Sequence, residues 1–258
     1  PKGELSKHNI DCQHELPGVG QNLQDHLDVC LVQRCKQKIT YDTLNDIAVG
    51  LNYYLFKKGP GTSNVAEAGG FWQSPLAKDD RPDLQFHFVP AMLDDHGRNR
   101  IKGSGYTVHM CVLRPESRGQ ITLHSADPKA KAKIEANYLS APHDLELMVA
   151  GFKIQRQILA SSAFDPFRDD ELFPGSDVQT DEQIIEFIRQ KSESIYHPIG
   201  TCKMGQDGMA VVDAELKVHG LKGLRVVDAS VMPTLVSGNT NAPTIMMAEK
   251  ISDQILAG

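Results

Sequence analysis

A histidine and an asparagine near the C-terminal end carry the side chains best suited to chemistry in this chain. His197 lies in a turn where Pro198 and Gly200 restrict the backbone. A neutral imidazole takes up a proton near pH 7, so His197 is a candidate general base. Asn239, within the polar segment 237–241, offers an amide that can hydrogen-bond a substrate oxygen without competing for its proton. Together they suit removal of a hydroxyl proton beside an electron-rich cofactor.

Both residues also have simpler structural interpretations. A lone histidine often donates a hydrogen bond to a backbone carbonyl and has no catalytic role. An asparagine in a loop with glycine is often selected because it tolerates left-handed backbone geometry. Residue type and spacing leave these alternatives open.

The segment 223–255 predicts a short strand, an irregular loop and a helix, and these elements would position a cofactor. The strand ends at Asp228 and Ala229, and ligands of α/β sheets bind at the carboxyl ends of strands. A simple turn capped by the Asp228 side chain is the alternative. The helix is predicted to start near Pro243 with no acidic residue in its first turn, so its free N–H groups favour an anion.

Four stretches of the sequence are similar to those of the GMC (glucose-methanol-choline) oxidoreductases, flavoenzymes that oxidise alcohols. They are LPGVGQNLQDH at 16–26, GTCKMG at 200–205, VDAS at 227–230 and SGNTNAPT at 237–244. The resemblance implies an FAD cofactor. It also implies that His197 accepts the substrate hydroxyl proton, with Asn239 in the position that some members fill with a second histidine.

The same resemblance implies a set of cofactor-binding residues. Asp228 and Ala229 would lie against the diphosphate-ribityl region of FAD. Asn241 and Pro243 would lie near the N1/O2 edge of the flavin, which is anionic when reduced. No metal ligands are implied.

The reaction that this resemblance implies is oxidation of a primary alcohol to an aldehyde, with a small-molecule alcohol as substrate. Choline dehydrogenase is the alternative, as is a non-catalytic fragment that lacks its nucleotide-binding half. A zinc- or NAD-dependent alcohol dehydrogenase is disfavoured, because both metal-ligand spacing and a dinucleotide fingerprint are missing. Whether a quinone or oxygen accepts the electrons is left open.

The sequence contains no GxGxxG dinucleotide fingerprint. Gly18 and Gly20 are followed by Gln21, Asn22 and Leu23, so the third glycine is missing, and Pro17 rather than a hydrophobic strand precedes them. Because the family carries this motif near its N-terminus, we expect Pro1 to lie roughly in mid-protein. The resemblance implies FAD-domain segments at 1–29 and 194–258, with a substrate-binding domain at 30–193.

Composition excludes several classes of function. The formal net charge of −6 offers no basic surface for nucleic acid. No apolar run approaches the roughly 18–20 residues that cross a bilayer. Five scattered cysteines without a CxxC pair indicate reduced thiols rather than zinc ligands or disulfides. We therefore expect a cytoplasmic protein, with peripheral membrane association as an alternative.

Hydrophobic periodicity predicts an α+β fold with a mainly antiparallel sheet. Helices are predicted near 4–8, at 45–56, from Pro142 to Leu159, behind a capping box at 180–183, and from Pro243 to Leu256. Alternating residues predict strands at 84–88, 106–112, 121–123 and 134–138, and short strands at 211–213 and 224–227. The segment 164–177 is predicted to be a loop. Histidines 87, 109 and 124 are predicted on the polar faces of strands, solvated or structural.

Overall fold

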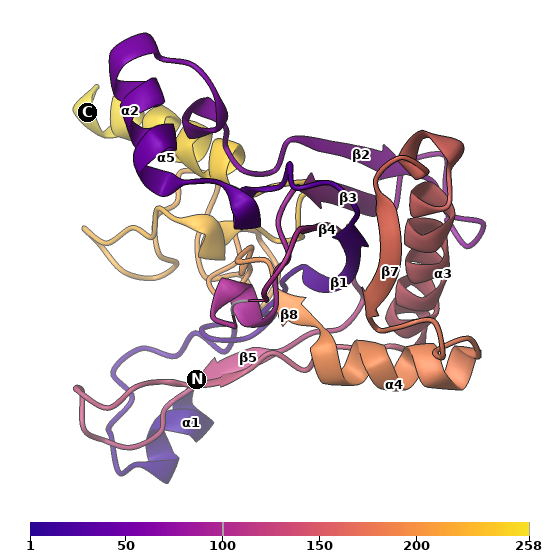
Figure 1. Cartoon of the computed structure of the whole chain (residues 1–258). Helices are drawn as coiled ribbons and strands as arrows, with labels where there is room; N and C mark the ends of the chain where they lie inside the picture. The colour runs from indigo at the N-terminus through magenta and orange to yellow at the C-terminus, as the bar shows by residue number, and fades with distance from the viewer. Residues whose placement is uncertain (100, 258) are drawn as a thin grey trace. The chain divides into compact units, whose positions relative to one another are not determined.

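The computed structural model describes residues 1–99 and 101–257 (Figure 1). Its contacts divide the chain into two compact units. The first unit comprises Pro1–His26, Leu113–Asp144 and Ile195–Gly258, and the second comprises Leu27–Val112 and Leu145–Ser194. The chain therefore leaves the first unit twice and returns to it each time. The crossings near 26 and 194 lie close to the predicted domain boundaries, whereas 113–144 belongs to the first unit. The assignment of FAD-binding and substrate-binding roles to these parts stays a prediction.

An antiparallel sheet is the centre of the second unit. Its strands run in the order β2-β3-β4-β1-β7, and β8 pairs with one end of β1. Their bounds are β1 Leu27–Cys35, β2 Ala68–Trp72, β3 Leu84–Val89, β4 Gly105–Val112, β7 Arg168–Phe173 and β8 Glu193–Ser194. β1 and β4 pair in a register that sets Val29 opposite Met110 and Leu31 opposite Val108.

Three helices belong mainly to this unit: α2 Asp46–Phe56, α3 Pro142–Leu159 and α4 Asp181–Lys191. α3 runs alongside β7 (Figure 1), where Arg156 donates to Glu171. The fully buried Gln155 of α3 donates to the Val29 and Val108 carbonyls of β1 and β4. Phe152, also fully buried, packs against Phe187 on α4, with the two ring centroids 5.7 Å apart. Burial of one such side chain contributes about 1.5–3 kcal/mol, so this face holds α3 and α4 to the unit.

The first unit has less regular structure. It contains α1 Lys2–Lys7, the strand pair β5 Gln120–Thr122 and β6 Lys133–Glu135, and α5 Asn241–Leu256. Its core is a cluster of buried aliphatic side chains, which are Val211, Val212, Leu216, Val218, Val231 and Ile251. Ile251 belongs to α5, so burial on this side holds the C-terminal helix in place.

The predicted α+β class with a mainly antiparallel sheet is confirmed. All five predicted helices are present, and α4 has the predicted capping box between Thr180 and Gln183. α5 begins at Asn241, two residues before the predicted Pro243. The predicted helix at 45–56 is α2, but its apolar side chains are exposed; Ile47 is 75% exposed.

Several predictions about which segments form strands need correction. The prediction of a loop at 164–177 is wrong for Arg168–Phe173, which is β7, an edge strand whose acidic residues hid it. β1 and β2 were not predicted. β1 is buried along most of its length, with β4 on one side and β7 and β8 on the other, so it lacks polar alternation. Segments 211–213 and 224–227 form isolated bridges rather than strands: Val212 pairs with Met204 and Val218, and Arg225 pairs with Lys217.

No helix in the described part of the chain has the length and apolarity required to cross a membrane.

Candidate active site

The segment that carries His197 is held against the segment 22–26, far away in sequence. Gln24 and Ile199 exchange two backbone hydrogen bonds, at 3.1 and 2.9 Å. Gly200, with φ of 98°, approaches so closely that a Cβ atom would lie 2.4 Å from the Asn22 carbonyl oxygen. Only glycine fits this position, because both the backbone angle and the contact exclude a side chain.

An acidic residue next to this contact holds the backbone of His197 itself. Asp25 Oδ1 accepts a hydrogen bond from the His197 N–H at 2.9 Å, and its Oδ2 accepts one from the Tyr138 hydroxyl at 2.5 Å. The preceding residue, Tyr196, has a φ of 64°, which is uncommon for a residue other than glycine. The turn around His197 is therefore fixed by side-chain contacts as well as by Pro198.

The loop that carries Asn239 is held by the same segment 22–26. The side-chain amides of Asn22 and Gln24 both donate to the Pro233 carbonyl, at 3.2 and 3.1 Å. Gln24 Oε1 accepts from the backbone N–H of Leu235 at 3.2 Å. One short stretch thus fixes both halves of the site, which explains why two residues distant in sequence converge.

His197 and Asn239 lie next to each other, as their types and motifs predicted. Asn239 Nδ2 is 3.3 Å from His197 Nε2. His197 is only 8% exposed. An amide N–H and a ring nitrogen at this separation can both reach one substrate oxygen. The distance supports a shared site, while the catalytic role of each residue stays a prediction.

His26 is part of this arrangement and was not predicted. Its Nδ1 lies 2.9 Å from His197 Nδ1, and its ring is fully buried. The motif LPGVGQNLQDH, which ends at His26, was the available signal. It was interpreted only as a turn, because nothing in the sequence indicates that this turn meets residues 197–200.

Asp228 and Ala229, predicted to bind cofactor, lie at a short 3₁₀ turn, η5 Ala229–Val231. Asp228 Oδ1 accepts from the Ser230 N–H at 2.8 Å, which is the simple capping contact considered from the sequence. The Ser230 carbonyl in turn accepts from the Cys202 N–H at 2.9 Å. The turn is thus tied to the segment after His197, and its contact with FAD stays a prediction.

Asn241 and Pro243, the other two predicted cofactor residues, lie in the first turn of α5. This described turn has no acidic residue, and the N-cap Thr240 makes no side-chain capping bond. The backbone N–H groups of Asn241 and Ala242 precede the first intrahelical bond, which runs from Thr244 to the Thr240 carbonyl at 3.1 Å. Uncapped N–H groups without an acidic neighbour favour an anion, and the contact of this turn with the cofactor stays a prediction.

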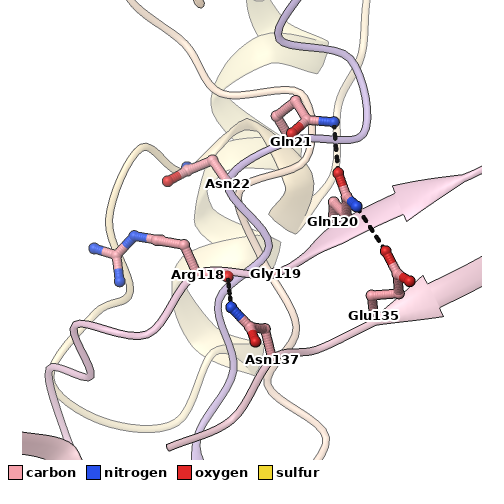
Figure 2. A pocket seen from close by; sticks show the side chains of 7 residues that line it. All are labelled: Gln21, Asn22, Arg118, Gly119, Gln120, Glu135 and Asn137. Carbon is pink, nitrogen blue, oxygen red and sulfur yellow. Dashed lines mark hydrogen bonds between the residues drawn. The ribbon is translucent and has the colours of Figure 1, made fainter. Parts of the chain in front are cut away.

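A polar cleft of about 490 Å³ lies elsewhere in the first unit (Figure 2). Gln120 links its two sides, accepting from Gln21 at 3.3 Å and donating to Glu135 at 2.6 Å. Asn137 donates to the Arg118 carbonyl at 2.9 Å. Neither His197 nor Asn239 lines this cleft, so it is separate from the pair.

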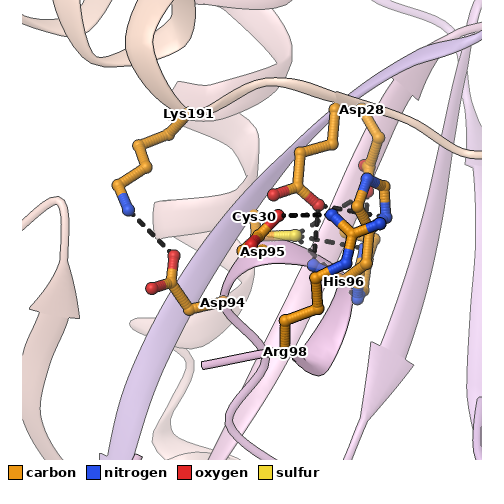
Figure 3. A network of polar contacts seen from close by, with 9 residues as sticks. Asp28, Cys30, Asp94, Asp95, His96, Arg98 and Lys191 are labelled. Carbon is orange, nitrogen blue, oxygen red and sulfur yellow. Dashed lines mark hydrogen bonds and ion pairs between the residues drawn. The ribbon is translucent and has the colours of Figure 1, made fainter. Parts of the chain in front are cut away.

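The second unit contains a compact group of an acid, a thiol and an imidazole on β1 and β4 (Figure 3). Asp28 Oδ2 lies 2.5 Å and Cys30 Sγ 3.2 Å from His109 Nδ1. The three ligand-type atoms lie within 4.8 Å of one another, a spacing that a metal ion could use, but the short Asp28 contact already occupies the imidazole Nδ1. His109 is therefore paired, and the prediction of a solvated or merely structural side chain missed this partner.

Burial and charge together shift the pKa values of His109 and Cys30 in this group. Burial acts to lower the pKa of His109, but the attraction and hydrogen bond of Asp28 outweigh it, so that pKa is raised. Burial and then the Asp28 charge raise the pKa of Cys30 well above its ordinary value, so the thiol stays protonated. Nearby, Asp94, Asp95 and His96 each have a different partner, which are Lys191, Arg98 and Glu193 (Figure 3).

Comparisons with known proteins place this chain among flavoenzymes. It is 49% identical to an alcohol dehydrogenase [acceptor] of Pseudomonas putida, over 98% of the chain and 47% of the relative. It is 46% identical to an oxygen-dependent choline dehydrogenase of Pseudomonas putida strain KT2440, over 99% of the chain and 46% of the relative. The chain thus spans about half the length of the curated relatives it matches.

Solved structures of similar fold agree with these relatives. A formate oxidase from Aspergillus oryzae, studied for its FAD modification, superposes with a TM-score of 0.91 at 28% identity and covers 100% of this chain and 50% of its own. A pyridoxine 4-oxidase superposes at 0.84 with 24% identity, which shows the fold alone, over 100% of this chain and 47% of its own. A family model described as GMC oxidoreductase matches residues 115–248, more than half of the sequence. The chain therefore belongs to the GMC oxidoreductase family.

Proposed function

We propose that this chain supplies the proton-accepting site of an enzyme that oxidises a primary alcohol to an aldehyde with FAD. The observation that carries the proposal is the contact of the buried His197, through Nε2, with Nδ2 of the exposed Asn239 at 3.3 Å. An imidazole nitrogen facing an amide donor suits a hydroxyl group, which donates to the first and accepts from the second. The relatives that share the whole chain are named as alcohol and choline dehydrogenases.

The chain's own residues handle the proton and the orientation of the alcohol. Asn239 donates a hydrogen bond to the substrate oxygen and turns the hydroxyl hydrogen toward His197. His197 Nε2 takes this hydrogen as a proton, which leaves the oxygen free to form the carbonyl double bond. The nearly complete burial of His197 limits the access of bulk water to its ring.

FAD fits the residues present in the first unit. When bound, it supplies the acceptor for the hydride that leaves the carbon of the alcohol. The start of α5, with Asn241 and Pro243, offers uncapped N–H groups and no acidic side chain, which suits the anionic edge of a reduced flavin. Asp228 and Ala229 are the further positions that would hold the cofactor, and η5 with Ala229 is tied by Ser230 to the His197 segment.

Replacement of His197 by alanine in the full-length enzyme tests the role of the base. We expect FAD to stay bound and the rate of flavin reduction by a primary alcohol to fall about 10²–10⁴-fold, the usual contribution of a positioned base. Anaerobic stopped-flow absorbance measures this rate directly. The exposed His124, in the same unit, provides a matched control, and His124→Ala should reduce at the wild-type rate.

A His197→Ala enzyme that is reduced as fast as wild type would rule out His197 as the base. Loss of FAD from that variant would instead indicate a structural role, which the flavin absorbance of the purified protein distinguishes.

Choline is the second candidate substrate, because a choline dehydrogenase is nearly as similar as the alcohol dehydrogenase. A quaternary ammonium needs a carboxylate or an aromatic cage beside the reacting carbon. Described neighbours of His197 in sequence, such as Tyr196 and Ile199, are mostly apolar. Flavin reduction by a straight-chain alcohol and by choline, compared at equal concentration, decides between the two.

The electron acceptor and the location of the enzyme are separate parts of the proposal. None of the five cysteines, which all lie in the described part of the chain, forms a disulfide, and this supports a reducing compartment such as the cytoplasm. Exposed apolar side chains on α2, including Leu51 and Phe56, would suit peripheral attachment to a membrane. A quinone acceptor would fit that attachment, and oxygen is the alternative.

A further inference from the structure

Two histidines from distant parts of the first unit form a chain of hydrogen bonds that ends at the candidate site. His26 Nε2 lies 3.0 Å from the Leu113 carbonyl oxygen, and His26 Nδ1 lies 2.9 Å from His197 Nδ1. The rings meet edge to face, with centroids 5.1 Å apart and an interplanar angle of 85°. His26 is fully buried, so water does not compete for these contacts.

The carbonyl at one end decides where each proton lies. A carbonyl oxygen only accepts, so His26 Nε2 must carry its hydrogen. A neutral imidazole has one N–H group, so His26 Nδ1 is an acceptor and His197 Nδ1 must be the donor. His197 Nε2 therefore has a lone pair, and this is the nitrogen that faces Asn239 Nδ2.

We propose that His26 is a positioning residue that holds His197 in the one neutral tautomer able to accept a proton from the substrate, and that it then shares this proton. The inference rests on the proposed role of His197 as the base. Without an acceptor at Nδ1, His197 would be free to place its hydrogen on Nε2 and could not remove the hydroxyl proton.

The second step follows from the same geometry. When His197 Nε2 takes a proton, the imidazolium has hydrogens on both nitrogens, and its Nδ1–H already points at His26 Nδ1. Transfer of that hydrogen as a proton leaves His197 neutral, with its hydrogen on Nε2. His26 becomes the imidazolium, and its Nε2–H still donates to the Leu113 carbonyl.

An acidic side chain beside the pair suits one positive charge spread over two rings. Asp25, the neighbour of His26, accepts from the His197 N–H and from the Tyr138 hydroxyl. Arg114, which follows Leu113, carries a like charge that opposes this one, and its guanidinium donates to Ser237 in the Asn239 loop at 3.1 Å. The Asp25 carboxylate is hydrogen-bonded to the His197 backbone, and its negative charge offsets part of the cost of a buried cation.

Two substitutions of His26 separate its two hydrogen bonds. Asparagine places an oxygen near the position of Nδ1, so His26→Asn keeps an acceptor for His197. Glutamine places its amide near the position of Nε2, so His26→Gln keeps a donor to Leu113 and removes that acceptor. In the full-length enzyme we expect His26→Gln to slow flavin reduction by about 10²-fold, the cost of a misaligned reacting group, with little change in the apparent substrate dissociation constant.

His26→Asn should recover most of that rate, which a purely space-filling role would not explain. FAD content and melting temperature, measured for both variants, show that each is folded. The proposal is overturned if His26→Gln is reduced as fast as wild type, or if His26→Asn is as slow as His26→Gln.

A spectroscopic measurement on the wild-type enzyme is independent of both variants. Long-range ¹H–¹⁵N NMR of ¹⁵N-histidine protein distinguishes a protonated from an unprotonated ring nitrogen. We expect His197 with hydrogen on Nδ1, and the opposite tautomer would overturn the proposal even if a variant failed to fold. Flavin reduction at the wild-type rate in His197→Ala would instead refute the role of His197 as the base. That result would not change the tautomer that NMR measures for His197 in the wild-type enzyme.

Discussion

At the scale of single residues, each unit contains a histidine whose partner influences its protonation: His197 is buried, and His109 is partly buried. In the first unit an imidazole contacts His197 at Nδ1, which leaves the other nitrogen for the proposed role as base. In the second unit a carboxylate holds His109 and favours its charged form. The two partners therefore favour different protonation states of histidine, because a neutral imidazole and a carboxylate differ in charge.

Replacement of Asp28 by asparagine should lower the pKa of His109. Without the carboxylate, burial is the remaining large effect, and burial disfavours the imidazolium. NMR titration of the His109 ring measures the change. The exposed Asp170, on β7 of the same unit, gives the control Asp170→Asn, for which the pKa of His109 should stay as in wild type.

The sign of the effect on stability follows from the direction of this pKa. Because the folded pKa of His109 is raised, its contribution to stability is fully present below the unfolded pKa of about 6.5 and is lost as the pH rises through the folded pKa. Urea unfolding across that pH range should show a loss of stability in wild type that is reduced in Asp28→Asn. Equal pH dependence in both proteins would show that the pair does not form.

At the scale of elements, the start of α5 is the feature with a consequence for the cofactor. Ala242 is exposed in a first turn that has no acidic side chain. An aspartate there should stabilise the helix, while its charge opposes a nearby reduced flavin. We expect Ala242→Asp to lower the flavin midpoint potential of the full-length enzyme by about 5–40 mV, with no loss of melting temperature.

The neutral variant Ala242→Asn is the matched control, since it changes size but not charge. Spectroelectrochemical titration measures both potentials. If the aspartate and asparagine variants share the wild-type potential with FAD fully bound, α5 does not point at the flavin and Asn241 and Pro243 lose their proposed role.

At the scale of the whole molecule, the first unit is assembled from three separate stretches of chain. It contains the proposed proton acceptor and the anion-favouring helix start. The 258 residues contain no GxGxxG turn to bind the pyrophosphate of a dinucleotide. The site is therefore expected to need a nucleotide-binding segment in addition to these residues.

The purified 258-residue chain tests that expectation. We expect it to be colourless and to stay so after incubation with FAD and gel filtration, whereas the full-length enzyme is yellow. Circular dichroism serves as the control that the short chain is folded. Stoichiometric flavin absorbance in the short chain would show that the first unit alone binds FAD tightly.

Local patterns in the sequence determined much of the fold. Alternation over 84–88 and 106–112 identified β3 and β4, and the Thr180–Gln183 capping box identified the start of α4. These signals are readable because side-chain period and end capping depend on residues within a few positions. The motifs around His197 and Asn239 likewise indicated the chemistry of the site, since residue type decides what a side chain can donate or accept.

Only the tertiary structure decided which distant segments meet. The contact of His26 with His197 spans 171 positions, and that of Asp28 with His109 spans 81. β1 was not predicted for a related reason. It is a central strand, buried between its neighbours along most of its length, so its sequence lacks the polar alternation that marks a half-exposed strand. Such contacts depend on chain topology rather than local periodicity, so the tautomer of His197 and the charge of His109 were set only when the fold brought their partners within hydrogen-bonding distance.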